Sequence, residues 1–259
     1  MCNSVDEGGL TSLEVVSEQG HRWRMEDAHH VEPNFAGKGW IFGGVYDGHR
    51  GSFAAVYAEQ NLHLQLAKEL KKNISPGHAF VEAYHAISSQ LEDQESGATA
   101  VTFLIQGREL TVAHAGDARA LLIRTDGWMQ LTRDHRLEED SERERIEQCG
   151  GIVRHPYVMR GMQGLMPTRT LGDSYFKPVG VIATPDVFRQ RIGPEDRFLI
   201  AACDGLFDVM SNDEVAEAAA ESSDPQDLAD RLRREVLEVR MGMDNLTIVV
   251  HDLRTISAG

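Results

Sequence analysis

The sequence predicts a single α+β domain built largely from antiparallel sheets. Predicted strands and helices occur in blocks and do not alternate strictly, which is typical of the α+β class. No composition break, linker or repeat divides the 259 residues, and a chain of this length can bury a substantial core. We assign residues 10–259 to one domain and the polar, glycine-containing residues 1–9 to a flexible N-terminal segment.

The first half of the chain contains both element types. Hydrophobic alternation predicts strands, and apolar residues at helical spacing predict helices. The expected strands are 10–17, a buried run at 41–46 that ends in the turn signal Asp47-Gly48, and 99–105, 109–114 and 118–123; the expected helices are 52–72 and 78–93. Because glycines separate the last three strands, we expect them to form an antiparallel meander.

The second half repeats this mixture. A charged helix is expected at 138–148 because Gly150-Gly151 is a C-terminal stop signal. The two glycines in 161–164 predict a mobile loop. The remaining expected elements are strands at 180–183, 197–203 and 246–251, and helices at 212–220 and 225–240.

Composition excludes several classes of function. A net charge of −15 argues against a nucleic-acid binder, which needs a basic face. The three cysteines, Cys2, Cys149 and Cys203, are too few and too widely spaced for a disulfide framework or a Cys-rich zinc site. We therefore expect a reducing compartment, the cytoplasm, with the nucleus left open. No signal peptide or membrane-spanning run is visible, and we expect a monomer without a membrane partner.

Carboxylates recur where apolar strands begin or end. Asp47 and Asp204 each follow such a strand and precede a glycine, and Asp244 comes directly before one. If these ends converge, the carboxylates repel one another unless cations bind them. Oxygen ligands select hard ions such as Mg²⁺ or Mn²⁺, and two ions can activate water and hold a phosphoryl group. Three unrelated turn aspartates are the alternative.

Residues 20–29 are dense in charge. Arg22 and Glu26 share a face whether the segment is extended or helical, so a cation and a carboxylate are presented together. The alternative is a solvated charged edge.

An ordered set of short motifs covers nearly the whole chain. They are Arg22 with 25–29 (MEDAH), 45–49 (VYDGH), 96–100 (SGATA), 115–119 (AGDAR), 131–135 (LTRDH), 144–146 (ERI), 150–151 (GG), 168–173 (TRTLGD), 202–209 (ACDGLFDV) and 244–245 (DN). In this order they resemble the metal-dependent serine/threonine protein phosphatases, the PPM class of type 2C. The resemblance implies a four-layer α-β-β-α sandwich, in which two packed antiparallel β-sheets are flanked by helices.

The resemblance also implies the metal ligands and the partners. Asp47 would bridge two Mg²⁺ or Mn²⁺ ions and Gly48 would offer its carbonyl. Asp204 and Asp244 would bind the first ion, and Glu26, supported by Asp27, the second. Asp117 and Asp208 match a third, weaker ion site, although Asp117 could instead pair with Arg119. Phosphoprotein substrates and a signalling role follow from the family.

The same resemblance assigns the remaining chemistry. Arg22 would grip the phosphate through its planar guanidinium. His49 would protonate the departing oxygen, with a turn role as the alternative, while Asp173 is expected to be structural. The chain departs from the family at Arg50, at 165–170 and in the variable flap 155–164, where substrate choice is expected.

A metal-dependent phosphatase for phosphoserine and phosphothreonine is therefore the expected function. The alternatives are an inactive pseudophosphatase that only binds, and a di-metal phosphoesterase for small molecules.

Overall fold

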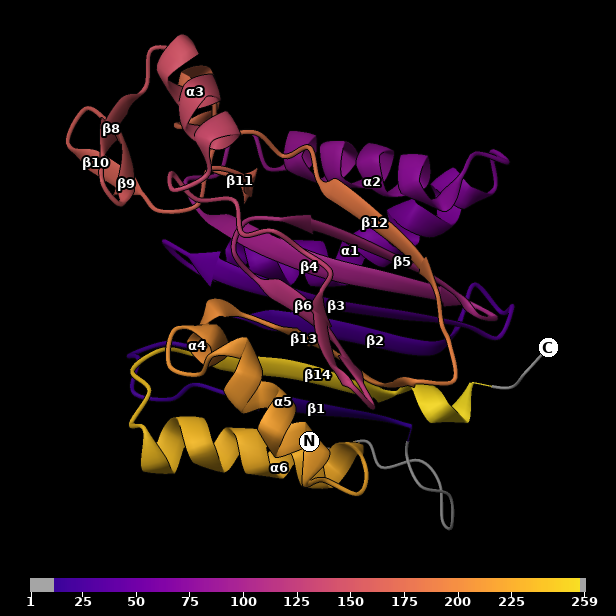
Figure 1. Ribbon diagram of the computed structural model, residues 1–259. Coiled ribbons are helices and arrows are strands. Elements are labelled where there is room, and N and C mark those ends of the chain that lie inside the picture. Colours follow the sequence, from indigo (N-terminus) through magenta and orange to yellow (C-terminus); the bar gives the residue numbers. More distant parts are fainter. Residues whose placement is uncertain (1–11, 257–259) are drawn as a thin grey trace.

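A computed structural model describes residues 12–256, so the predicted flexible segment 1–9 and the start of the strand predicted at 10–17 lie outside the described residues. Two large antiparallel sheets pack face to face, and helices cover both outer faces (Figure 1). This arrangement confirms the predicted α+β sandwich. Among residues 12–256, no helix is long and apolar enough to cross a bilayer.

The first sheet has the strand order β12-β5-β4-β3-β2, with the short β11 paired to β4. Helices α1 and α2 cover its outer face, at the upper side of Figure 1. The bounds are β2 Ala28–Phe35, β3 Trp40–His49, α1 Phe53–Leu70, α2 Pro76–Gln90, β4 Gly97–Gln106, β5 Glu109–Ala115, β11 Leu171–Gly172 and β12 Asp186–Arg191.

The second sheet has the order β1-β14-β13-β6-β7, and its outer face carries the C-terminal helices. The bounds are β1 Leu13–Glu18, β6 Arg119–Arg124, β7 Gly127–Gln130, β13 Asp196–Ala202, α4 Asp204–Phe207, α5 Asn212–Ala220, α6 Pro225–Arg234, a π-helical turn at Glu235–Val239, β14 Leu246–Asp252 and a 3-10 turn at Leu253–Thr255. Strand β14 therefore lies between β13 and β1, the first strand among the described residues.

Alternation along the central strands builds three apolar layers. In β3, Val45 faces the space between the sheets, where it packs with Val101 and Val249. Its neighbour Tyr46 points the other way, toward the helices α1 and α2. These buried layers hold the strand ends in fixed positions.

A small subdomain projects from this sandwich. It contains α3 (Asp140–Gln148), a 3-10 turn at Lys177–Val179, and a three-stranded sheet of β8 (Ile152–Arg154), β9 (Tyr157–Arg160) and β10 (Gln163–Leu165). Ile146, Val158 and Phe176 form its own apolar cluster. The loop predicted at 161–164 is instead the turn and second strand of a hairpin, because Gln163 pairs with Arg160.

Two strand predictions were wrong. The expected meander breaks after β5, because β6 joins the other sheet and β12 takes the place beside β5. The chain crosses between the sheets at Gly116, whose φ of +112° favours glycine. Residues 180–183 form no strand: the structure shows only an isolated bridge between Ile182 and Arg169.

Candidate functional site

A cleft of about 330 Å³ contains all nine residues predicted for the site. They are Arg22, Glu26, Asp47, Gly48, His49, Asp117, Asp204, Asp208 and Asp244. The cleft lies where strand ends of both sheets approach each other beside the small subdomain, which contributes Gly164, Leu165, Met166 and Pro167. Segments more than two hundred residues apart thus meet in one place, since Arg22 contacts Asp244.

Strand β3 delivers Asp47 and His49 together. Residues two apart in a strand share a face, so both side chains continue the inward row of Val45. The turn expected at Gly48 is wrong: β3 runs through His49, and the positive φ angles are at Arg50 and Gly51.

Gly48 is needed for a close approach and not for a turn. A Cβ atom there would lie 2.2 Å from the Glu26 carbonyl oxygen and 3.1 Å from the Ala55 Cβ. Any larger residue would therefore push the Glu26 segment away from the end of β3.

The second sheet contributes the other carboxylates. Asp204 opens the short helix α4 directly after β13, and Asp208 follows one turn later, where its N–H donates to the Asp204 carbonyl at 2.8 Å. Asp244 lies two residues before β14. The three recurrent aspartates therefore converge: Asp204 and Asp244 come from the neighbouring strands β13 and β14, and Asp47 comes from β3 of the facing sheet.

Asn245 fixes the charged segment against β14. Its side-chain oxygen accepts from the Glu26 N–H at 2.9 Å, and its amide nitrogen donates to the carbonyls of Gln19 and Arg24 at 2.8 and 3.0 Å. The Glu26 carboxylate accepts from the Gly51 N–H at 2.6 Å. The segment 19–26 is thus an ordered loop and is neither extended nor helical. Arg22 and Glu26 both line the cleft, but Arg22 pairs with Asp244 and not with Glu26.

The carboxylates strongly perturb one another. Burial, followed by the charges of Asp204, Asp27 and Asp117, raises the pKa of Asp47 well above its usual range. Burial, followed by Asp117 and Asp208, raises the pKa of Asp204 to about 8. A bound cation would relieve both effects.

The donor set also fits hard cations. Apart from the Gly48 carbonyl, the ligands expected in the cleft offer carboxylate oxygens, which Mg²⁺ and Mn²⁺ prefer. The Thr99 hydroxyl lines the same cleft, is buried, and has no hydrogen-bond partner among residues 12–256. A buried orphan hydroxyl of this kind calls for a water or another polar group in the cleft.

Two arginines offset part of the negative charge. Arg22 donates to Asp244 at 2.5 Å while its side chain remains 56% exposed, and this hydrogen bond raises the pKa of Arg22. Arg136 donates to Asp117 at 2.7 Å and lies 3.5 Å from both Asp204 and Asp208.

Sequence reasoning missed Arg136. It follows directly after the motif that ends at His135, so position next to a motif was the only available signal. In the structure its guanidinium lies among the carboxylates assigned to the third ion.

His49 is held by a partner that we expected to be only structural. Its Nε2 lies 2.8 Å from Oδ2 of the fully buried Asp173, whose other oxygen accepts from Arg50. Burial and the charge of Arg50 lower the pKa of His49 to about 4. The Arg50 guanidinium thus places its positive charge beside Asp173. It also packs over the Phe176 ring, 5.0 Å from the ring centroid.

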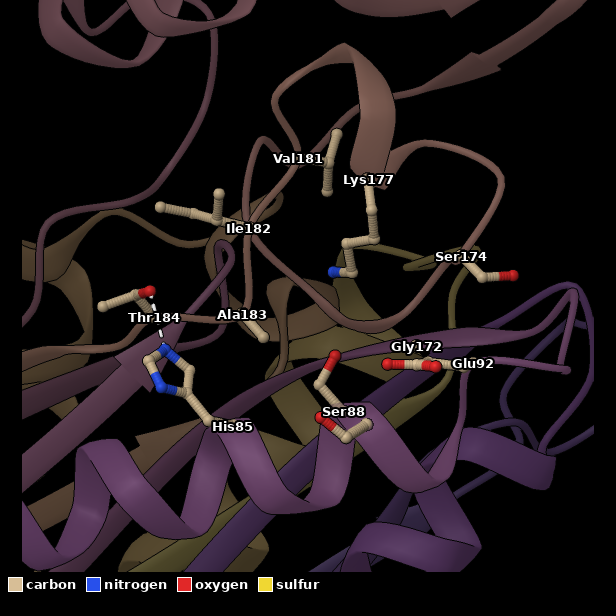
Figure 2. A pocket seen from close by; sticks show the side chains of 11 residues that line it. His85, Ser88, Glu92, Gly172, Ser174, Lys177, Val181, Ile182, Ala183 and Thr184 are labelled. Atoms are coloured by element: carbon tan, nitrogen blue, oxygen red, sulfur yellow. Dashed lines mark hydrogen bonds between the residues drawn. The ribbon is translucent and has the colours of Figure 1, made fainter.

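A second cavity, of about 350 Å³, lies between α2 and the small subdomain (Figure 2). Lys177 points its amine toward Ser88 in this view and donates to the Thr170 carbonyl at 2.6 Å. Burial lowers the pKa of Lys177 to about 7. None of the nine predicted residues lines this cavity, and it offers no cluster of carboxylates.

Comparison with known proteins gives one consistent result. The family model described as Protein phosphatase 2C matches residues 11–243. The chain is 34% identical to probable protein phosphatase 2C 59 of Arabidopsis thaliana, over 95% of this chain and 81% of that protein. It is 33% identical to probable protein phosphatase 2C 45 of Oryza sativa subsp. japonica, over 95% of this chain and 89% of the relative.

A solved structure shares the fold. The serine-threonine phosphatase 2C from Toxoplasma gondii superposes with a TM-score of 0.80 at 24% identity, covering 93% of this chain and 94% of that one. Together these matches confirm the family resemblance drawn from the ordered motifs.

Proposed function

This chain belongs to the protein phosphatase 2C family, and we propose that it hydrolyses phosphoserine and phosphothreonine monoesters on proteins at a dinuclear Mg²⁺ or Mn²⁺ centre. One observation carries the proposal. Carboxylates from both sheets share a single cleft with an exposed arginine and a histidine–aspartate pair. Phosphate-ester hydrolysis needs these three kinds of group: metal ligands, a phosphate clamp and a proton donor.

The metal-holding residues follow from the cleft and the family pattern. Asp47 would bridge the ions, Asp204 and Asp244 would complete the first site, and Glu26 with the Gly48 carbonyl would serve the second. The ions, when bound, supply Lewis acidity that activates water and neutralises charge on the phosphate. Asp117 and Asp208 would hold a third, weaker ion if the Arg136 guanidinium moves from its present position between them.

Arg22 would orient the substrate. Its guanidinium lies at the rim, mostly exposed, and its contact with Asp244 keeps it over the cleft. A planar, permanently charged fork can donate two parallel hydrogen bonds to a phosphate, which a lysine ammonium cannot do in the same way.

His49 would deliver a proton to the departing serine or threonine oxygen. Its ring is oriented by Asp173 at 2.8 Å. A carboxylate at that distance favours the protonated imidazole and so opposes burial and Arg50, which lower the pKa. The charges of Asp117 and Glu26 also raise the pKa of His49, so its protonation depends on Asp173 together with these carboxylates.

Substrate choice is proposed to lie with the small subdomain. The loop after β10 forms one wall of the cleft, and Gln163 accepts from Arg50 at 3.1 Å, which links the subdomain to the end of β3. Residues 10–259 as one catalytic domain, a monomeric state and a cytoplasmic location stay predictions.

Phosphate release from a phosphothreonine peptide tests the proposal. We expect activity with Mn²⁺, none with chelator, and loss of activity in Asp204→Asn. The matched control is Asp126→Asn, because the Asp126 side chain is 75% exposed and does not line the cleft. Tight phosphoprotein binding without hydrolysis would identify a pseudophosphatase, and activity on a small ester alone would identify a small-molecule phosphoesterase.

A further inference from the structure

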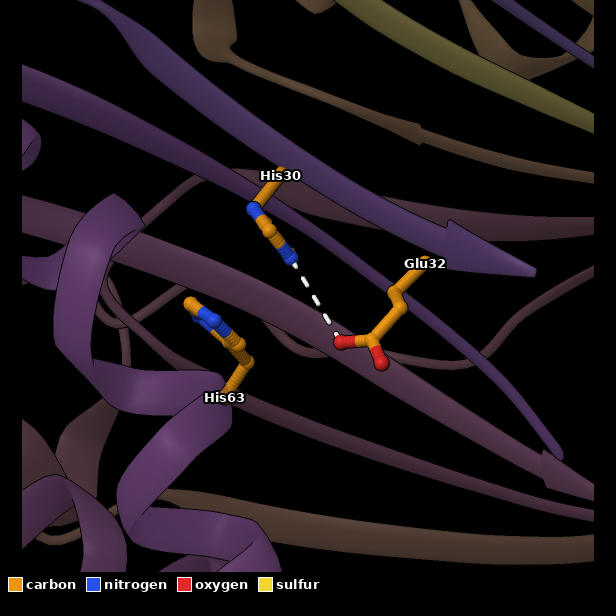
Figure 3. A group of neighbouring side chains, drawn as sticks. All are labelled: His30, Glu32 and His63. Atoms are coloured by element: carbon orange, nitrogen blue, oxygen red, sulfur yellow. Dashed lines mark ion pairs between the residues drawn. The ribbon is translucent and has the colours of Figure 1, made fainter. Parts of the chain in front are cut away.

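A cluster of metal-ligating side chains lies outside the cleft, at the junction of β2 and α1. His30 and Glu32 are two residues apart on β2 and so share a face, and His63 projects toward them from α1 (Figure 3). One donor atom of each side chain lies within 4.8 Å of the others. His30 Nε2 is 3.8 Å from Glu32 Oε2.

The hydrogen bonds leave ring nitrogens available as ligands. His63 Nδ1 lies 3.1 Å from the Glu59 carbonyl oxygen. Because a carbonyl can only accept, Nδ1 carries the proton and Nε2 keeps its lone pair. A backbone carbonyl bound to the distal nitrogen is the usual way in which proteins orient metal-ligating histidines.

His30 offers an independent sign of a missing ligand. Its Nε2 is buried and has no hydrogen-bond partner among the described residues 12–256. A buried polar atom in this state lacks a compensating interaction, which a metal ion would supply.

The surroundings of His30 favour its neutral form. They stack with their centroids 3.9 Å apart, a distance at which two imidazolium ions would repel. Burial, and after it the neighbouring His63, lowers the pKa of His30. The buried Phe42 packs against both rings, with its ring centroid 6.0 Å from that of His30 and 6.3 Å from that of His63. Neutral imidazole is the form that binds metals.

We propose that His30, Glu32 and His63 form a second metal site, separate from the cleft, for a borderline divalent ion such as Zn²⁺. Two imidazoles and one carboxylate suit Zn²⁺, Co²⁺ or Ni²⁺ better than Mg²⁺. Donor atoms of a tetrahedral zinc site lie roughly 3.3 Å apart, given bonds of about 2.0 Å. The two rings now stack nearly parallel, with an interplanar angle of 13°, so their in-plane lone pairs do not point at one ion. Closing the group therefore needs one imidazole to rotate about its Cβ–Cγ bond, in addition to movements of about 1 Å by these half-buried side chains. The remaining position is left for water.

A second histidine group does not qualify in the same way. His114, His135 and Asp186 also lie within 4.8 Å of one another. The Asp186 carboxylate is already held by Arg169 at 2.7 Å. It lies 3.2 Å from His135 Nε2, which has no hydrogen-bond partner among residues 12–256. His114 Nε2 contacts the backbone of Arg133.

The proposed site would connect two elements that lead into the cleft. Strand β2 begins directly after Glu26 and Asp27, and α1 begins shortly after His49. An ion bound by both elements would therefore stabilise the positions of these segments without contacting substrate.

Titration with Co²⁺ in excess Mg²⁺ tests the proposal, because Mg²⁺ occupies oxygen sites and Co²⁺ bound by imidazole absorbs visible light strongly. We expect one equivalent of Co²⁺ with this absorption in the wild type, its loss in His63→Gln, and at least about tenfold weaker binding in Glu32→Gln. Zn²⁺ should displace Co²⁺ and raise the wild-type Tm by about 5 °C.

His85→Gln is the matched control, because His85 lies on α2 and bonds to Thr184 away from this group. It should bind Co²⁺ like the wild type. The proposal is overturned if the wild type shows no such absorption, or if His63→Gln and Glu32→Gln both keep it. Glu32 is half-exposed on an edge strand, so we expect Glu32→Gln to fold. It therefore still tests the proposal if His63→Gln does not fold.

Discussion

Replacing Gly97 with alanine should disconnect His49 from Asp173 while leaving every predicted metal ligand in place. Gly97 is the first residue of β4 and pairs with His49 in the sheet. A Cβ atom there would be 2.0 Å from Asp173 Oδ2 and 2.6 Å from His49 Nε2, both far inside normal contact distance. Asp173 is fully buried and is also bound by Arg50. The added Cβ atom can therefore be accommodated only if the hydrogen bond between His49 and Asp173 is broken.

The expected size of the effect follows from that contact. A hydrogen bond to a charged group contributes about 1.5–3 kcal/mol. If it is lost only when His49 acts, the rate falls by about 10- to 150-fold. General acid catalysis as a whole contributes roughly 10²–10⁴-fold, so a loss in this range corresponds to misplacing the acid and not to removing the metal centre.

The assay compares two substrates in the same metal buffer. A phosphothreonine peptide releases a poor leaving group that needs a proton, whereas p-nitrophenyl phosphate releases a stabilised phenolate that needs none. Gly97→Ala should lower kcat on the peptide by the factor above and change kcat on the phenyl ester much less.

The control is Gly77→Ala, a matched substitution whose Cβ would meet only Val187 at 3.3 Å. Equal losses on both substrates would refute the reasoning, because they would indicate damage to the metal centre or to the fold. An unchanged peptide kcat would also refute it.

Three further perturbations have definite outcomes. Gly48→Ala should raise the Mn²⁺ concentration for half-maximal activity by about tenfold, because its Cβ displaces the Glu26 carbonyl. Arg136→Gln should lower the free energy of unfolding, measured with urea, by about 3 kcal/mol, since it leaves the buried Asp117 unpaired; saturating Mn²⁺ should restore part of this loss. Burial lowers the pKa of His114 to about 4, so the unfolded chain binds more protons between pH 6.5 and 4. His114 therefore contributes a fall in stability toward acid of up to about 1.4 kcal/mol per pH unit in this window. His114→Phe removes this contribution, so its free energy of unfolding should decrease less toward acid than that of the wild type; identical pH dependence in the two proteins would contradict this.

Local sequence patterns identified the main helices and the buried strands, but they missed β2, β7 and β12. They located the three recurrent aspartates of the cleft, whereas the roles of the other cleft residues came from the family resemblance. The Asp-Gly signals after two apolar runs identified Asp47 and Asp204 because strand ends are positions where a carboxylate reaches solvent. The same patterns could not assign strands to sheets. Strand β6 is buried on both faces, so nothing in its alternation indicates that it leaves β5 for the opposite sheet.

Contacts between residues far apart in the sequence could not be predicted either. Asp173 was expected to be structural because it lies in a Leu-Gly-Asp turn, yet its contact with His49 spans 124 residues. Arg136 carries no pattern of its own, and its role depends on Asp204 at the start of α4 and Asp208 at its end. The prediction of a turn at Gly48 was wrong because glycine is favoured both in turns and where two backbones approach closely. Only the position of the Glu26 carbonyl, known from the structure, shows that the close approach is the reason here.

The position of β14 has a consequence for the order in which the protein matures. Strand β14, the last strand in the described part of the chain, is inserted between β13 and β1, the first strand in that part. Asp244 and Asn245 arrive with it, and both contact residues 19–26. A nascent chain therefore cannot assemble its cleft before residues 244–245 have been synthesised, and a premature stop ahead of β14 would leave more than two hundred residues without a complete cleft.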